Sequence, residues 1–185
     1  GKASHEAGLA CEVHLEPQVA GDLVDDRHET PAPQRWQQGL RPLQVGGNLV
    51  IDDCYNANPA SMQAGLAVLA DRGGRRLAVL GHMGELGAAS LHGHRLVGSE
   101  AARLGVALIA VGPLAQPILD AYHEAGGADG RHVADRQAAG RMAVQWMRDA
   151  GACSVLVKGS RSAHLEDALT EICTGFGAKF PGGVH

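Results

Sequence analysis

From Gly46 onward, the sequence alternates short runs of consecutive apolar residues with longer segments in which apolar residues recur at helical spacing. Strands that are apolar along their whole length and separated by helices are typical of a parallel sheet covered on both faces. We therefore predict an α/β doubly wound domain with a mostly parallel sheet of five or six strands. Strands are expected at 48–53, 76–81, 107–112 and 154–159, with a short extra strand at 131–135, and helices at about 59–71, 91–104, 115–125, 138–149 and 163–174.

The first 45 residues lack this alternation. They are polar, contain four prolines and have apolar patches without a helical or strand period. A chain of 185 residues is long enough for one domain with an appendage. We expect an irregular arm or a remnant of another domain at 1–45, to which we assign no fold, the α/β body at 46–178 and a tail at 179–185.

The amino-acid composition argues against some classes of binding partner. The formal net charge is -4 and no cluster of basic residues occurs, so we expect no nucleic-acid partner and no membrane partner. The four cysteines have no CxxC spacing and are expected to be reduced thiols. We recognise no signal peptide, and no apolar stretch approaches the roughly 20 residues of a membrane span. We therefore expect a cytoplasmic protein.

Polar loops follow four of the predicted strands. DDCYNANP follows the first strand, GHMGELG the second, GPLAQ the third and KGSRS the last. The carboxyl ends of parallel strands meet at one edge of the sheet, where ligands bind in such folds. These loops are therefore expected to form one binding edge.

Two adjacent carboxylates, Asp52 and Asp53, end the first strand. Neighbouring carboxylates repel each other unless a cation, a hydroxyl-rich ligand or a set of hydrogen-bond donors compensates them. We expect a ligand-binding role for Asp53 and a structural role for Asp52, although satisfying backbone donors in the turn would also explain Asp53. Asn58 before Pro59 predicts a helix cap, and any ligand role of Asn58 is additional to the cap.

Lys158, Ser160 and Arg161 lie just before the last predicted helix, whose amino end carries partial positive charge. They form a candidate anion site, with a solvated basic turn as the alternative. His92 and His94 are two residues apart on a predicted helix, so they make a poor metal pair and are expected to be solvated.

Several common enzyme motifs are absent from the sequence. No GxGxxG follows the first strand, and neither GxxxxGK[ST] nor GxSxG occurs. Their absence argues against an autonomous NAD-dependent enzyme, ATPase or hydrolase.

Four blocks of the sequence resemble the carboxy-terminal region of the Mur ligases. They are VIDDCYNANPASMQAGLAVLA at 50–70, GRRLAVLGHMGELGAAS at 74–90, HRLVG at 94–98 and VLVKGSRSAHLEDALTEI at 155–172. The resemblance implies that 46–178 is the Rossmann-like domain of an ATP-dependent acid–D-amino-acid ligase of peptidoglycan biosynthesis. In the implied reaction, the carboxylate of UDP-N-acetylmuramoyl-tripeptide is phosphorylated by ATP and then attacked by the amine of D-Ala-D-Ala. His82 stands where the family has a carboxylate.

The same resemblance implies roles for individual residues. Asp53 would contact the ribose of ATP, and Tyr55 and Asn58 would line the space between the nucleotide and the dipeptide. The residues that would bind the dipeptide or the anionic intermediate are Asn56, Lys158, Ser160 and Arg161. No catalytic residue and no metal ligand is assigned on this chain.

The full-length family uses ATP and Mg²⁺, with an amino-terminal domain for the UDP moiety and a central domain that carries a phosphate loop. This chain has no such loop. We therefore expect it to be inactive alone, to bind neither ATP nor Mg²⁺ tightly, and to act with the N-terminal and central ligase domains in cis or in trans. The alternatives are a non-catalytic nucleotide- or dipeptide-binding module that acts with a partner chain, and a generic domain that binds an unrelated anion at the same edge.

Overall fold

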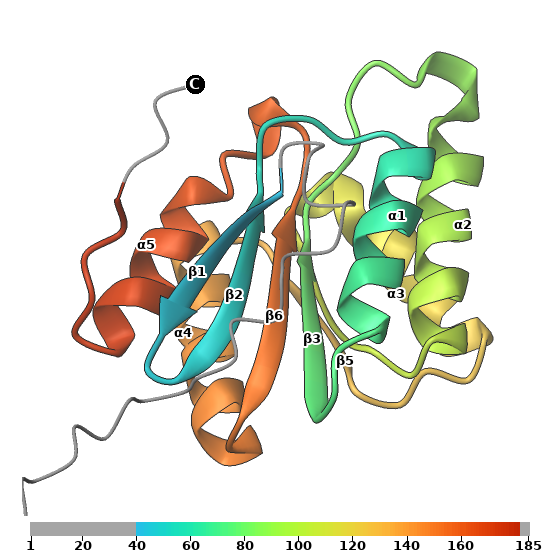
Figure 1. The fold of residues 1–185 in the computed structure, drawn as a ribbon. Coiled ribbons are helices and arrows are strands. Elements are labelled where there is room, and N and C mark those ends of the chain that lie inside the picture. The colour runs from blue at the N-terminus through green and yellow to red at the C-terminus, as the bar shows by residue number, and fades with distance from the viewer. Residues whose placement is uncertain (1–39, 182–185) are drawn as a thin grey trace, which may run out of the picture. The chain divides into compact units, whose positions relative to one another are not determined.

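The structure, a computed structural model, describes residues 40–181, so most of the predicted arm and the last four residues of the tail lie outside the described residues. The described part is an α/β domain with a six-stranded sheet in the order β1-β2-β6-β3-β4-β5 (Figure 1). The strands are β1 (Arg41–Val45), β2 (Asn48–Asp53), β3 (Arg75–Leu80), β4 (Ala107–Val111), β5 (Gly130–Val133) and β6 (Cys153–Lys158).

Five helices connect and follow the strands. They are α1 (Pro59–Ala70), α2 (Ser90–Arg103), α3 (Gln116–Glu124), α4 (Arg136–Ala150) and α5 (Glu166–Gly175), with short 3-10 turns η2 (Gly87–Ala89), η3 (Pro113–Ala115) and η4 (Arg161–Ala163). Every predicted strand and helix is confirmed, with ends that differ by no more than three residues. The predicted doubly wound, mostly parallel fold is therefore confirmed. No helix within residues 40–181 is long and apolar enough to span a bilayer.

Strand β1 was not predicted from the sequence. It pairs antiparallel with β2, whereas β2, β6, β3, β4 and β5 run parallel to one another. It lies inside the segment 1–45 to which we assigned no fold, so the regular body begins before Gly46. Exposed residues alternate with partly buried ones along β1 until Val45 is reached. Pro42 is tolerated because an edge strand pairs on one side only.

Alternate residues of the central strands enter two separate cores. Leu77 and Val79 of β3 belong to the core that α4 and α5 cover. Ala78 and Leu80 of the same strand, with Leu156 of β6, belong to the core that α1, α2 and α3 cover. Figure 1 shows these two groups of helices on opposite faces of the sheet. This alternation decides to which face each polar residue at the strand ends points.

The segment after α5 packs against the first of these cores. Phe176, Ala178 and Phe180 contact the core under α4 and α5. The ring centre of Phe180 lies 5.2 Å from Cζ of Arg41 on β1. Phe180 belongs to the predicted tail at 179–185, yet it covers part of the core at the β1 side.

Candidate functional site

Because side chains alternate between the two faces of a strand, the carboxylates of Asp52 and Asp53 at the end of β2 point to opposite faces of the sheet. Asp53 lies in register with Lys158 of the neighbouring parallel strand β6. The preceding residue of β6, Val157, is in the core under α4 and α5, so Lys158 points to the opposite face, beneath α1. Asp53 points to the same face as Lys158, and Asp52 points away from it.

Asp52 is held by β1 and by its own turn. Nη2 and Nε of Arg41 donate to Oδ2 of Asp52 at 2.7 Å and 3.1 Å. The backbone N–H of Cys54 donates to Oδ1 at 3.2 Å. Asp52 is buried, and both of its oxygens are used inside the fold. The expected structural role of Asp52 is therefore confirmed.

Asp53 forms a buried ion pair on the α1 side of the sheet. Nζ of Lys158 lies 2.6 Å from Oδ2 of Asp53, and the side chains of the two residues are 1% and 13% exposed. Nζ also donates to the carbonyl oxygen of Asn56 at 2.8 Å. Burial raises the pKa of Asp53 above its ordinary 3.8, while the hydrogen bond and charge of Lys158 lower it and the charge of Asp52 raises it. Within residues 40–181, Oδ1 of Asp53 has no hydrogen-bond partner.

The start of α1 is fixed by a capping box, as predicted for Asn58. The backbone N–H of Ser61 donates to Oδ1 of Asn58 at 2.9 Å, and the backbone N–H of Asn58 donates to Oγ of Ser61 at 3.1 Å. Pro59 occupies the first helical position, where its missing N–H costs nothing. The polar loop before α1 therefore runs from one fixed point, the Asp53–Lys158 pair, to another, the capping box.

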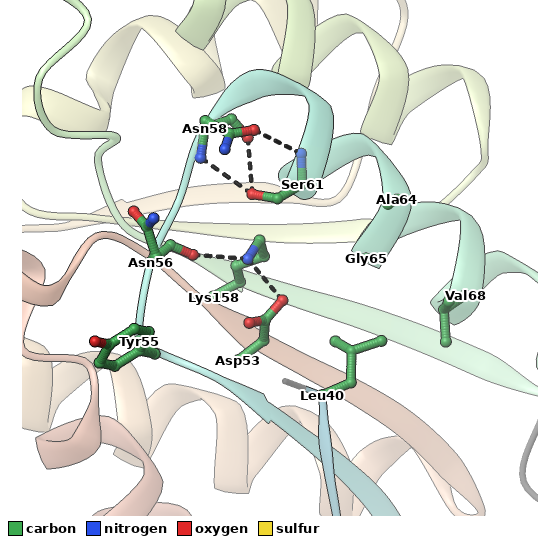
Figure 2. Close-up of a pocket in the computed structure, with 10 residues that line it drawn as sticks. All are labelled: Leu40, Asp53, Tyr55, Asn56, Asn58, Ser61, Ala64, Gly65, Val68 and Lys158. Carbon is green, nitrogen blue, oxygen red and sulfur yellow. Dashed lines mark hydrogen bonds and ion pairs between the residues drawn. The ribbon is translucent and has the colours of Figure 1, made fainter. Parts of the chain in front are cut away.

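These groups line a cavity of about 490 Å³ between the ends of β2 and β6 and helix α1 (Figure 2). Its polar lining consists of Asp53, Tyr55, Asn56, Asn58, Ser61 and Lys158, and its apolar lining of Leu40, Ala64, Gly65 and Val68. Figure 2 shows Lys158 between the Asn56 carbonyl and the Asp53 carboxylate. The cavity combines a carboxylate with an apolar wall, which suits a ligand that carries hydroxyl groups on an apolar or aromatic body.

Sequence reasoning missed one face of α1. Ser61, Ala64, Gly65 and Val68 have the spacing i, i+3, i+4, i+7 and line the cavity together. The opposite face carries Met62, Leu66 and Leu69 into the core. The helix is apolar or small on nearly every side, so its pattern does not distinguish the cavity face from the core face.

Ser160 and Arg161 lie outside the lining of this cavity. The backbone N–H of Ser160 donates to the carbonyl oxygen of His82 at 3.0 Å, and the hydroxyls of Ser160 and Ser162 are 3.0 Å apart. Nε2 of His82 is 3.0 Å from Oγ of Ser162. Burial and the nearby His94 lower the pKa of His82 below its ordinary 6.5. Five predicted site residues thus line the cavity, and Ser160 and Arg161 belong to a second polar cluster at the tips of β3 and β6.

Arg161 connects the two groups. Its Cζ lies 5.8 Å from the ring centre of Tyr55, which lines the cavity and is 58% exposed. Cation–π contacts of this kind are typical between a guanidinium and an aromatic face. The second cluster is therefore adjacent to the open side of the cavity, next to Tyr55.

The expectation that both helix histidines are solvated is wrong for His94. His94 is 2% exposed, Nε2 accepts the backbone N–H of Met83 at 2.9 Å, and Nδ1 lies 2.7 Å from the carbonyl oxygen of Ser90. It therefore ties the loop after β3 to α2, whereas His92 is exposed. The spacing of the pair could not show that the loop after β3 folds back over α2. Among residues 40–181, no three His, Cys, Asp or Glu side chains gather closely enough to hold a metal ion.

Comparison with known proteins identifies the family. The sequence profile described as "Mur ligase, glutamate ligase domain" matches residues 40–161. The chain belongs to the Mur ligase family. Residues 40–161 are therefore the carboxy-terminal domain of a Mur ligase, and the Rossmann-like fold implied by the resemblance is confirmed.

Curated relatives of this Mur ligase domain are longer proteins that share the same name. The UDP-N-acetylmuramoyl-tripeptide--D-alanyl-D-alanine ligase of Escherichia coli K12 is 38% identical over 132 residues, which cover 70% of this chain and 28% of that ligase. The ligase of the same name from Mycobacterium leprae is 38% identical over 159 residues, which cover 75% of this chain and 30% of that ligase. The chain thus spans less than a third of the length of these relatives.

Solved structures agree with this assignment. A crystal structure of MurF from Acinetobacter baumannii superimposes with a TM-score of 0.67 at 30% identity, over 73% of this chain and 30% of that one. MurF from Thermotoga maritima, solved in complex with ADP, has a TM-score of 0.63 at 24% identity, over 74% of this chain and 30% of that one, and this second likeness shows the fold alone.

Proposed function

We propose that this Mur ligase domain is part of an ATP-dependent ligase that adds D-Ala-D-Ala to UDP-N-acetylmuramoyl-tripeptide. Within that ligase, the domain supplies the subsite for the nucleoside end of ATP. The relatives that share 38% identity with this chain carry the name of this activity. The remaining parts of the active site come from the N-terminal and central ligase domains, in cis or in trans, because a ligase must hold ATP in line with its acceptor.

One observation carries the proposal. Asp53 lines the cavity, and its Oδ1 has no hydrogen-bond partner among residues 40–181. The apolar part of the cavity lining includes Leu40 and Val68. A carboxylate oxygen accepts strongly from hydroxyl donors, and an apolar wall favours a flat aromatic base. Ribose and adenine meet both requirements in one ligand.

The other predicted residues divide between two ligands. Tyr55 and Asn58 border the cavity and would face the phosphates and the dipeptide. Arg161, which lies next to Tyr55, and the neighbouring Ser160 would bind the carboxylate of D-Ala-D-Ala, since Arg pairs with carboxylates in bidentate geometry. Asn56 would border the nucleoside with its side chain while its carbonyl holds Lys158.

Mg²⁺ does not fit the described part of the chain. Mg²⁺ is held by carboxylates, substrate phosphates and water, and residues 40–181 contain no group of three or more candidate ligands. Asp53 already shares one oxygen with Lys158. We therefore assign the metal to the other ligase domains and derive no step through it here.

A chimeric ligase tests the proposal. Residues 40–181 would replace the homologous segment of the Escherichia coli ligase, and ADP release would be measured with UDP-N-acetylmuramoyl-tripeptide, D-Ala-D-Ala and ATP. We expect ADP release that requires both acceptor substrates. The E. coli ligase without its segment and the 185-residue chain alone are the controls, and neither should turn over ATP.

Two results would contradict this account. Turnover by the isolated chain would show that the N-terminal and central ligase domains are not essential. A folded chimera that binds ATP without acceptor-dependent turnover would instead favour the non-catalytic binding module that acts with a partner chain.

A further inference from the structure

Lys158 is the largest fully buried side chain of the described domain, which is unusual for a residue expected to bind a substrate anion. Its side chain is 1% exposed. Two of its three N–H groups are directed to Oδ2 of Asp53, at 2.6 Å, and to the carbonyl oxygen of Asn56, at 2.8 Å. Asp53 is the last residue of β2 and Asn56 lies in the loop that follows it, so Lys158 holds the start of that loop against β6.

The fold makes room for this lysine beneath α1. A Cβ atom built on Gly65 would lie 3.4 Å from Cδ of Lys158 and 3.1 Å from Cδ2 of Leu156. A Cβ atom at position 65 would therefore reach van der Waals contact with the aliphatic stem of Lys158 and would crowd Leu156. The glycine costs helix stability at this position, and it allows the lysine stem to pass between α1 and the sheet.

The charge of Lys158 is already compensated. A buried ammonium at 2.6 Å from a carboxylate has little remaining attraction for a ligand anion, whereas Oδ1 of Asp53 has no partner within the described chain. We propose that Lys158 is a positioning residue, which acts on the nucleoside through Asp53 and does not bind the substrate anion itself. This inference rests on the proposed function, since it assumes that a nucleoside occupies the cavity.

The electrostatic surroundings of Asp53 make the proposal testable. Burial and Asp52 raise the pKa of Asp53, and only Lys158 lowers it. Tyr55 in the adjoining loop is the other ionisable group that lines the cavity, and α1 carries no ionisable side chain from Pro59 to Ala70. Removing Lys158 should therefore shift the titration of Asp53 to higher pH. Protonation of Asp53 takes away the charged acceptor, so nucleoside binding should shift with it.

Adenosine is the appropriate probe, because it has no phosphate that titrates in the same range. Its affinity for the 185-residue chain would be measured by NMR titration at several pH values from acidic to neutral, together with the titration of the Asp53 carboxyl carbon. Dideoxyadenosine, which lacks the ribose hydroxyls at positions 2′ and 3′, reports whether the diol is recognised. The variants are Lys158→Met, Asp53→Asn and the double variant.

We expect Lys158→Met to move the Asp53 titration and the pH dependence of adenosine affinity upward together. Where Asp53 is protonated, affinity should fall about tenfold to a hundredfold, the effect of one hydrogen bond to a charged group. In the Asp53→Asn background, Lys158→Met should cause no further loss, because the lysine acts through the carboxylate. Should Lys158→Met fail to fold, the double variant keeps the test valid, since uncharged pairs often replace buried ion pairs without loss of stability.

Arg41→Met is the matched control. Arg41 pairs with Asp52 at 2.7 Å on the other side of the same strand, so its removal should leave adenosine affinity unchanged at neutral pH, where Asp53 is ionised. Loss of affinity by the same factor at all pH values, or a further loss in the Asp53→Asn background, would show that Lys158 contacts the ligand directly and would overturn the proposal. If the wild-type chain binds adenosine no better than dideoxyadenosine, the proposed nucleoside site fails and this inference fails with it.

Discussion

Asn58 links the stability of α1 to the shape of the candidate site. Its side chain accepts the Ser61 N–H, and Ser61 accepts the Asn58 N–H in return. Both residues also line the cavity. The cap therefore sets where the helix begins and how the polar loop approaches the cavity, because two backbone donors are satisfied before the first helical turn.

We predict that Asn58→Ala lowers the free energy of unfolding of the 185-residue chain by about 1 kcal/mol, since an N-cap side chain contributes roughly that amount. Urea denaturation would measure the change. Asn58→Ser is the control, because serine caps about as well as asparagine. Equal stability of the alanine and serine variants would show that the cap contributes nothing.

At the scale of single residues, the sequence predicted a residue's structural role where that role depends only on its neighbours in the chain. Asn58 before Pro59 was identified as a cap because capping depends only on neighbours. The burial of His94 and the pairing of Lys158 with Asp53 depend on residues that are 11 and 105 positions away. No spacing rule within one segment contains that information, so these two placements could not be predicted.

Helices α2 and α3 pack with a close backbone contact that a glycine makes possible. Gly98 of α2 faces α3, and a Cβ atom built there would lie 1.9 Å from the carbonyl oxygen of Ile118. Gly98 thus allows α2 and α3 to approach each other closely. An alanine would have to push the two helices apart.

We expect Gly98→Ala to destabilise the domain by about 2 kcal/mol, in the range typical of overpacking. This loss should occur although alanine is intrinsically the better helix former by about 1 kcal/mol. Ser99→Ala, one residue further along α2 and exposed, is the control and should not lower stability. Thermal or urea unfolding measures both variants, and a Gly98→Ala variant at least as stable as the wild type would refute the close contact.

At the level of elements, the sequence predicted the parallel strands and all five helices. The parallel strands are buried on both faces of the sheet, so they appear in the sequence as continuous apolar runs that are easy to recognise. β1 was missed for a physical reason. It is a five-residue edge strand with exposed positions and a proline, so its pattern does not differ from that of a loop.

The whole domain buries its three described cysteines, Cys54, Cys153 and Cys173, as free thiols. Burial raises the pKa of Cys54 well above its ordinary value of 9.0, and the charge of Asp52 adds to this effect. The folded protein therefore keeps a proton that the unfolded chain loses above about pH 9. Since the unfolded state binds fewer protons in this window, the free energy of unfolding must fall as pH rises through it.

We predict that stability declines above about pH 9, with Cys54 contributing up to about 1.4 kcal/mol per pH unit. Cys54→Ala should be less stable at neutral pH, because it leaves a small cavity, yet its stability should decline less steeply in alkali. Urea denaturation across the alkaline range measures both slopes. Parallel slopes for the two proteins would show that Cys54 ionises as easily in the folded state as in the unfolded chain.

At the scale of the whole molecule, we propose that this domain acts as one part of a longer ligase. It covers 28% of the Escherichia coli relative, and its cavity offers a carboxylate and an apolar wall. We propose that Asp53 binds the ribose of ATP in the assembled enzyme. If Asp53 were only a turn residue, its loss would affect folding and leave substrate affinity unchanged.

The most direct test is the KM for ATP of the chimeric ligase with Asp53→Asn, measured beside its melting temperature on one preparation. Loss of one hydrogen bond to a charged group costs about 1.5–3 kcal/mol, so KM for ATP should rise about tenfold to a hundredfold. We expect the KM for D-Ala-D-Ala to stay close to the unsubstituted value. The melting temperature should fall whether or not Asp53 binds ribose, because asparagine leaves the buried Lys158 without its charged partner, so the KM for ATP decides the test. A lower melting temperature with an unchanged KM for ATP would contradict the account.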